Sequence, residues 1–188
     1  MRARFAVLLC CVLLTACATT ETEGPPTAFR LTAPGLGDNA MLAQKYAGNL
    51  KTNPNCIGQN VSPALQWSNA PEKTRSFVLL MDDQAGRAGL GVSHMVVYGI
   101  PASVTSFAEG ELSAASSRFL AGKNTPGTAG YFGPCPPRGN APQHYVFTLI
   151  ATDVEPAAIP AGLTKDELLK ALQGRALRAA GVVLRYAH

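Results

Sequence analysis

The chain has 188 residues, of which 47% are hydrophobic and 15% are charged, and its formal net charge is +4 at pH 7. This length and apolar content suffice for one domain with a substantial core. Part of the positive charge comes from Arg2 and Arg4 at the N-terminus, and no stripe of lysine and arginine follows. The composition therefore argues against nucleic acid as a partner.

The N-terminus has the features of a secretory signal. Basic residues precede the apolar run 5–14, which is too short to span a bilayer, and small residues follow it. The segment Leu14-Thr15-Ala16-Cys17 resembles the lipobox of bacterial lipoproteins, in which cleavage leaves the cysteine as a diacylated first residue. Two acyl chains anchor a protein durably to a membrane surface. An ordinary signal peptide that happens to contain a cysteine is the alternative.

This pattern divides the chain into three parts. We expect a signal peptide at 1–16, the lipidated Cys17 with a flexible tether up to residue 27, and one domain over 28–188. The expected location is the bacterial cell envelope. Ala18, rather than aspartate, follows the cysteine, which favours the periplasmic face of the outer membrane by the usual lipoprotein sorting rule.

The domain reads as short strands separated by turns. Short, continuously apolar runs bounded by proline or aspartate predict three buried strands, over 76–81, 95–100 and 145–151. Weaker patterns predict an opening strand over 28–31, an edge strand over 61–67 and a closing strand over 181–186. The polar segment 47–60 predicts a long loop. The segment 104–127, with small and polar residues and little pattern, predicts a long irregular connection.

One helix is predicted near the C-terminus. Thr164 and Glu167 form a capping box, with Leu163 and Leu168 placed as its hydrophobic staple. Three leucines share one helical face: Leu168, Leu169 and Leu172. Gly174 is expected to end the helix. Many short strands and one late amphipathic helix predict a mostly β protein, an antiparallel β-sandwich with helical cover.

The segment 130–139 contains three glycines and three prolines, which exclude a helix or a regular strand. It must therefore be a stiff loop. Because glycine lets the backbone approach a neighbour closely, this loop is a candidate wall of a ligand pocket. An ordinary surface connection rich in turn residues is the alternative.

Five cysteines indicate the redox chemistry of the chain. Cys10 and Cys11 lie in the expected signal, and Cys17 would carry lipid, which leaves Cys56 and Cys135. In an oxidising compartment these two predict a disulfide that closes a loop of about 80 residues and contributes about 2–4 kcal/mol. Two reduced core cysteines, or a reactive Cys135, are the alternatives.

Polar pairs stand at the ends of the three predicted buried strands: Asp82-Asp83, Ser93-His94 and Gln143-His144. Strand ends in a sandwich present loops, so these groups could converge on one rim. A carboxylate beside an imidazole raises the pKa of the imidazole, and the pair could hold an oxyanion or a phosphate. The competing interpretation is a hydrogen-bonded core histidine beside two ordinary strand-end acids.

Several blocks, taken in order, resemble the phosphatidylethanolamine-binding protein family, and most closely its bacterial YbhB/YbcL branch, which is named for similarity to Raf kinase inhibitor protein. The resemblance covers about 29–186. The blocks are Asn60-Val61-Ser62-Pro63, Trp67, Asp82-Asp83, His94-Met95-Val96-Val97-Tyr98-Gly99-Ile100-Pro101, Gly133-Pro134-Cys135-Pro136-Pro137-Arg138-Gly139 and Tyr145-Val146-Phe147-Thr148. The resemblance implies two packed antiparallel sheets with a C-terminal helix, and a small anion-binding pocket at one end.

The resemblance also implies which residues form that pocket. Asp83 matches the pocket aspartate, His94 the pocket histidine and Tyr145 the pocket tyrosine, while the loop supplies Gly133, Pro134, Pro136 and Pro137. Gln143 stands where the family has a second histidine, and the residue after Asp83 is Gln84 rather than proline. Gln143 can donate to an oxyanion, but without the charge of a protonated histidine.

These observations favour a lipid-anchored binding protein for a small anionic or phosphorylated ligand, such as a phospholipid head group, with no cofactor, no metal and no catalysis. An inhibitor or interaction protein that acts through its surface loops is one alternative. A thiol hydrolase with Cys135 as nucleophile and His94 as base is another. A metal site built from Cys56, Cys135, His94 and His144 lacks close ligand spacing.

Overall fold

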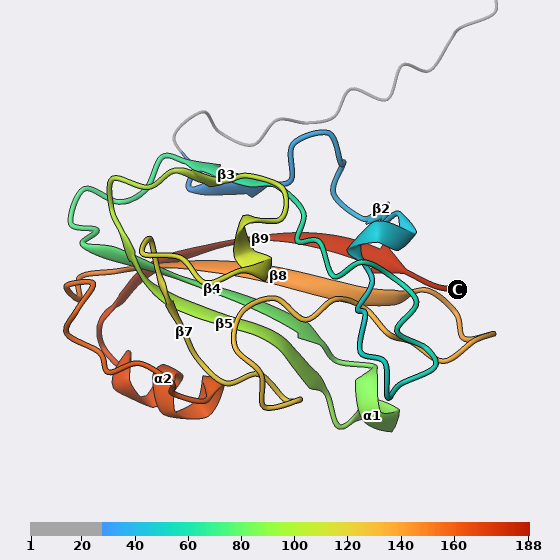
Figure 1. The fold of residues 1–188 in the computed structure, drawn as a ribbon. Helices are drawn as coiled ribbons and strands as arrows, with labels where there is room; N and C mark the ends of the chain where they lie inside the picture. Colours follow the sequence, from blue (N-terminus) through green and yellow to red (C-terminus); the bar gives the residue numbers. More distant parts are fainter. Residues whose placement is uncertain (1–27) are drawn as a thin grey trace, which may run out of the picture.

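The computed structural model describes residues 28–188. The expected signal peptide, the lipidation site Cys17 and the tether lie outside the described residues. The described part forms two sheets, and a helix covers the face of the larger sheet that lies away from the smaller one (Figure 1). The predicted mostly β sandwich with a C-terminal helix is confirmed. No helix within 28–188 is long and apolar enough to cross a membrane.

The smaller sheet has the strand order β1-β3-β6, and all its pairs are antiparallel. It consists of β1 (Arg30–Thr32), β3 (Leu65–Ser68) and β6 (Ser106–Phe107). The prediction of an edge strand over 61–67 is wrong, because β3 begins only after Pro63 and lies between β1 and β6. Proline lacks a backbone N–H, so it stands before the strand rather than at a sheet edge.

The larger sheet has the order β2-β9-β8-β4-β5-β7, and only the β2–β9 pair is parallel. The three predicted buried strands and the closing strand are confirmed as its four long members, β4 (Ser76–Asp83), β5 (Val92–Pro101), β8 (Gln143–Thr152) and β9 (Ala176–Tyr186). Short segments that carry no apolar run provide its edges, β2 (Ala40–Met41) and β7 (Leu120–Ala121).

The apolar run of β4 is continuous because both of its faces are covered. Successive side chains of a strand point to opposite faces, so Phe77, Leu79 and Met81 pack in the core between the sheets. Val78 and Leu80 pack instead in a second core beneath α2 (Lys165–Ala171), with Leu168 and Leu172 of that region. Each buried leucine or valine contributes about 1.5–3 kcal/mol.

The predicted capping box is present at the start of α2. The Thr164 side chain accepts from the Glu167 backbone N–H, and the Glu167 carboxylate accepts from the Thr164 N–H. The prediction that Leu169 shares the buried face is wrong: its side chain is 36% exposed, whereas Leu168 is fully buried. The helix ends at Ala171, and Gly174 takes a positive φ of 73° three residues later.

The remaining short elements lie in connections: 3-10 turns at Gln44–Tyr46 and Glu111–Ser113, and the turn α1 (Gly86–Gly89) between β4 and β5. Within α1, Arg87 and Ala88 both have left-handed backbone angles, so this turn is not a regular helix. The predicted long loop over 47–60 is confirmed, since no strand or helix lies in that range.

Candidate functional site

A cavity of about 380 Å³ opens at the end of the sandwich where β4 stops and where β5 and β8 begin. Six of the residues singled out from the sequence line it: Asp83, His94, Pro136, Pro137, Gln143 and Tyr145. The structure therefore brings together side chains from three strands and one loop. We call this space the inner cavity.

A β-bulge places His94 in the inner cavity. Met81 pairs with Met95, but Asp82 pairs with Ser93, so His94 is an extra residue with no partner on β4. Strict alternation would turn His94 to the same face as Val96, beneath α2. The bulge instead keeps it beside Asp83 and Tyr145, which is the kind of redirection that bulges produce near functional sites.

The neighbours of His94 fix its tautomer. Its Nδ1 lies 2.8 Å from the carbonyl oxygen of Phe132, so Nδ1 carries the proton and donates it. The His94 ring stacks on Phe132 and meets the Tyr145 ring edge-on, with centroids 5.7 and 5.1 Å apart. Nε2 is therefore the ring nitrogen that a ligand in the cavity can reach.

Burial sets the charge of His94. The side chain is only 4% exposed, and this desolvation lowers its pKa below the ordinary histidine value. The hydrogen bond to Phe132 and the negative charges of Asp83 and Asp82 oppose the effect but do not cancel it. At neutral pH the ring is therefore uncharged, and Nε2 is a hydrogen-bond acceptor.

Asp83 is held rigidly at the end of β4. It is 2% exposed, and its Oδ1 accepts from the backbone N–H groups of Ala85 and Gly86 at 2.9 and 3.1 Å. A Cβ on Gly86 would lie 2.6 Å from a methyl carbon of Val92 and 3.1 Å from Oδ2 of Asp83. Glycine at this position lets the turn close tightly over the carboxylate, which keeps Asp83 in the cavity wall.

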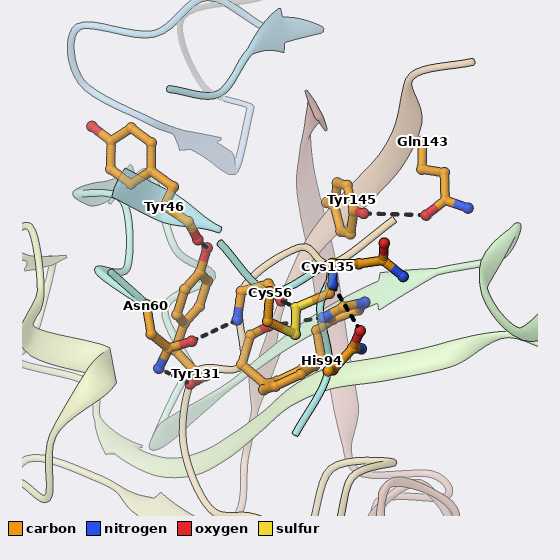
Figure 2. The surroundings of a disulfide bond; sticks show 12 residues. Tyr46, Cys56, Asn60, His94, Tyr131, Cys135, Gln143 and Tyr145 are labelled. Carbon is orange, nitrogen blue, oxygen red and sulfur yellow. Dashed lines mark hydrogen bonds between the residues drawn. A yellow bond between two sulfur atoms is a disulfide. The ribbon is translucent and has the colours of Figure 1, made fainter. Parts of the chain in front are cut away.

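Two further polar groups come from β8. The Tyr145 hydroxyl donates to Oε1 of Gln143 at 3.3 Å, and both residues line the cavity (Figure 2). Burial and the charge of Asp83 raise the pKa of Tyr145, so its hydroxyl stays protonated. With Oε1 engaged, the amide NH₂ of Gln143 is the group that can donate to a ligand. His144, next in the strand, is exposed on the opposite face.

Gly133 and Pro134 do not line the cavity. The Gly133 N–H donates to Oδ1 of Asn60 at 2.8 Å, and the Pro134 carbonyl accepts from Gly48 at 2.9 Å. The Tyr131 hydroxyl donates to the Tyr46 carbonyl, which extends the same contact (Figure 2). This part of the loop therefore docks on segment 46–60, and only Cys135, Pro136 and Pro137 of 133–137 reach the cavity.

The structure contains the Cys56–Cys135 disulfide. It joins the loop to segment 48–58, whose residues Leu50, Asn53 and Asn55 form another wall of the cavity. A disulfide sulfur is neither a thiolate nucleophile nor a metal ligand, and His144 faces away. The four residues of the alternative metal site therefore do not converge, and no metal-ligand cluster of three or more occurs among residues 28–188.

Sequence reasoning missed Arg87, which lines the inner cavity from the turn after β4. No motif marks this residue, because it lies in the segment 84–91, between the blocks Asp82-Asp83 and 94–101 that carry the family resemblance. Its left-handed backbone, with φ of 54°, is uncommon for a residue with a side chain. Arg87 supplies the cavity with a permanent positive charge.

Comparison with known proteins identifies the family. A model of the phosphatidylethanolamine-binding protein family matches residues 33–187. The chain belongs to the phosphatidylethanolamine-binding protein family. A UPF0098 protein of Aquifex aeolicus is 36% identical over 132 residues, which cover 70% of this chain and 77% of that protein. The resemblance found in the sequence is therefore confirmed.

Two further relatives of this family are informative. The "Putative lipoprotein LppC" of Mycobacterium tuberculosis is 35% identical over 159 residues, or 82% of this chain and 72% of that one. The crystal structure of Escherichia coli YbcL, described as a member of the mammalian PEBP family, superposes with a TM-score of 0.75. It has 27% sequence identity and covers 85% of this chain and 98% of YbcL.

Proposed function

We propose that this member of the phosphatidylethanolamine-binding protein family is an exported, lipid-anchored protein that binds a small anionic or phosphorylated ligand in the inner cavity. The observation that carries the proposal is the convergence of His94, Gln143 and Arg87 on one cavity. The proposal includes no catalytic step, because the Sγ atom of Cys135, the candidate nucleophile, is bonded to Cys56.

The charges in the cavity restrict the ligand further. Arg87 attracts an oxyanion, and the Gln143 amide and a protonated His94 can donate to it. Asp83 is a carboxylate in the same wall and would repel a bare anion. A zwitterion such as phosphoethanolamine, with its ammonium at Asp83 and its phosphate at Arg87, satisfies both charges. We therefore expect phosphoethanolamine to bind more tightly than inorganic phosphate.

Replacing His94 by alanine tests the site directly. At a pH at which His94 is protonated in the complex, removal of its charge-assisted hydrogen bond should weaken the binding of phosphoethanolamine by about 10–100-fold, as measured by titration calorimetry. The His144→Ala variant is the matched control, because His144 is an exposed histidine of β8 that does not line the inner cavity. Unchanged affinity in a folded His94→Ala protein would refute the proposed site.

The affinity for an oxyanion should depend on pH through His94. Its pKa is lowered in the free protein, and an anion at Nε2 raises it in the complex. Affinity should therefore increase as the pH falls through the pKa of the complex, by at most about tenfold per pH unit, and level off below the pKa of the free protein. Sulfate is a suitable probe because its own charge stays constant. A His94→Gln variant should lose this dependence, and an equal slope in both proteins would contradict the assignment.

Anchoring by lipid forms the second part of the proposal. Its support is the sequence around Cys17 and the similarity to a protein named as a lipoprotein. We expect the protein to sediment with the outer membrane after cell fractionation, and a Cys17→Ser variant to lose both the acyl chains and that location. Intact protein that retains residues 1–16 and lacks acyl chains would contradict this part alone.

A further inference from the structure

A second, larger cavity lies on the opposite face of the same hairpin end. It has a volume of about 460 Å³, and Asp82 and Ser93 line it where their neighbours Asp83 and His94 line the inner cavity. Asp82 and Ser93 are cross-strand partners, so the pair faces one side together. Two of the three polar pairs noted in the sequence, Asp82-Asp83 and Ser93-His94, are therefore divided between two cavities. We call the second one the outer cavity.

Positive charge predominates in the outer cavity. Arg87, Lys123 and Lys165 line it, against the carboxylates of Asp82 and Asp166. The Lys165 ammonium lies 2.8 Å from Oδ1 of Asp82, and this pair is partly buried. Within the lining, Asp166 is then the remaining counter-charge to Arg87 and Lys123, and Glu167 beside the cavity also interacts electrostatically with Lys123. Arg87 has no ion-pair partner among the described residues and can attract an anion together with Lys123.

Ser93, in the wall of the outer cavity, carries a hydrogen-bonding group without a partner in the structure. The Ser93 hydroxyl oxygen is buried and forms no hydrogen bond within the described residues. Its backbone groups, in contrast, bond to Thr125: the Ser93 N–H to the threonine hydroxyl and the Ser93 carbonyl to the Thr125 N–H, both at 2.8 Å. A buried hydroxyl without a partner is costly, and rotation of the Ser93 side chain toward the cavity would let a ligand oxygen accept its hydrogen bond.

The two cavities adjoin each other. Arg87, Val92 and Thr125 line both of them. We propose that the outer cavity is a second binding site, specific for a small ligand with an oxyanion group, which Arg87, Lys123 and the Ser93 hydroxyl hold. Binding in the outer cavity does not depend on the proposed function, because the two cavities share only the three residues named above. The expected coupling between the two sites does rest on the proposed function of the inner cavity.

The shared arginine couples the two sites. A single guanidinium cannot make its full set of hydrogen bonds in both cavities at once. Occupation of the inner cavity should therefore weaken binding in the outer cavity, and the reverse effect must be equal by linkage. The variants differ accordingly: Arg87→Ala weakens both sites, Lys123→Ala only the outer one and His94→Ala only the inner one.

Backbone amide NMR of the full-length protein in detergent, titrated with inorganic phosphate and in a second series with phosphoethanolamine, separates these outcomes for the outer and the inner cavity. We expect a saturable set of shifts at residues 93, 123–125 and 164–166, weakened about fivefold by Lys123→Ala. Lys73→Ala removes the same charge at the opposite end of β4 and should leave them unchanged. Lys165 is unsuitable as a first variant, because its removal leaves Asp82 without its ion-pair partner.

Each result of this titration has a definite meaning. Shifts at 93 and 123–125 without shifts at 132–137 would support the outer site while the proposed inner site fails. Shifts at 132–137 alone would overturn the outer site and leave the proposed function intact. Outer-site shifts that Lys123→Ala does not weaken would also overturn the assignment, and no shifts at either place would overturn both.

Discussion

A Gly133→Ala substitution should destabilise the fold by about 3 kcal/mol or more. The added methyl group would overlap backbone atoms, and no flexible side chain is present there that could move aside. A Cβ at this position would lie 2.3 Å from the Tyr46 carbonyl oxygen, 2.6 Å from the Gly48 nitrogen and 2.7 Å from the Ala47 carbonyl carbon. Either the loop or segment 46–48 must move to admit it. Denaturant unfolding measures the change.

Gly37 provides the matched control for this prediction. A Cβ at Gly37 has no atom within 4 Å, and its φ lies outside the left-handed region. Gly37→Ala should therefore leave the free energy of unfolding unchanged or raise it slightly, since alanine reduces the entropy of the unfolded chain. Equal stability of the Gly133→Ala and Gly37→Ala proteins would contradict the close contact of the loop with segment 46–48.

Removal of the disulfide should cost about 2–5 kcal/mol, since Cys56 and Cys135 close a loop with a sequence separation of 79. The loss should appear in a Cys56→Ala/Cys135→Ala double variant as a lower denaturant midpoint. Ligand affinity should fall as well, because segment 48–58 supplies Leu50, Asn53 and Asn55 to the cavity wall.

Reduction of the wild-type protein is the control for packing changes in that variant. If the cross-link carries the effect, reduced wild type and the double variant should have similar midpoints, and the oxidised wild type should be more stable than both. A reductant that changes the free energy of unfolding of the wild type by less than about 0.5 kcal/mol would show that the cross-link contributes little.

Much of the sandwich could be predicted because its long strands carry their own signal. Continuous apolar runs identified β4, β5 and β8, since the core between the sheets covers one face and the α2 layer covers the other. The short edge strands, β2 and β7, have two residues each, too few for any periodicity. Their strand conformation comes from pairing with β9 and β5, which is a long-range contact.

The site was only partly predictable, and His94 shows why. Family resemblance identified the residue, but strict alternation along β5 would turn it away from Asp83, and only the bulge between Met95 and Ser93 explains its position. The glycines of the loop were expected to approach a ligand. Gly133 instead approaches the backbone of segment 46–48. The lack of a side chain lets glycine approach a protein backbone as closely as a ligand, so the sequence alone does not distinguish the two.

We propose that the inner cavity binds a phosphate-bearing ligand through His94. The most direct measurement is a titration with phosphoethanolamine, followed by backbone amide NMR shifts in wild type and in His94→Ala. The proposed site predicts saturable shifts at residues 83–87, 94, 132–137 and 143–145, all strongly reduced in the variant. Absence of shifts at millimolar ligand, or shifts that persist in His94→Ala, would contradict it.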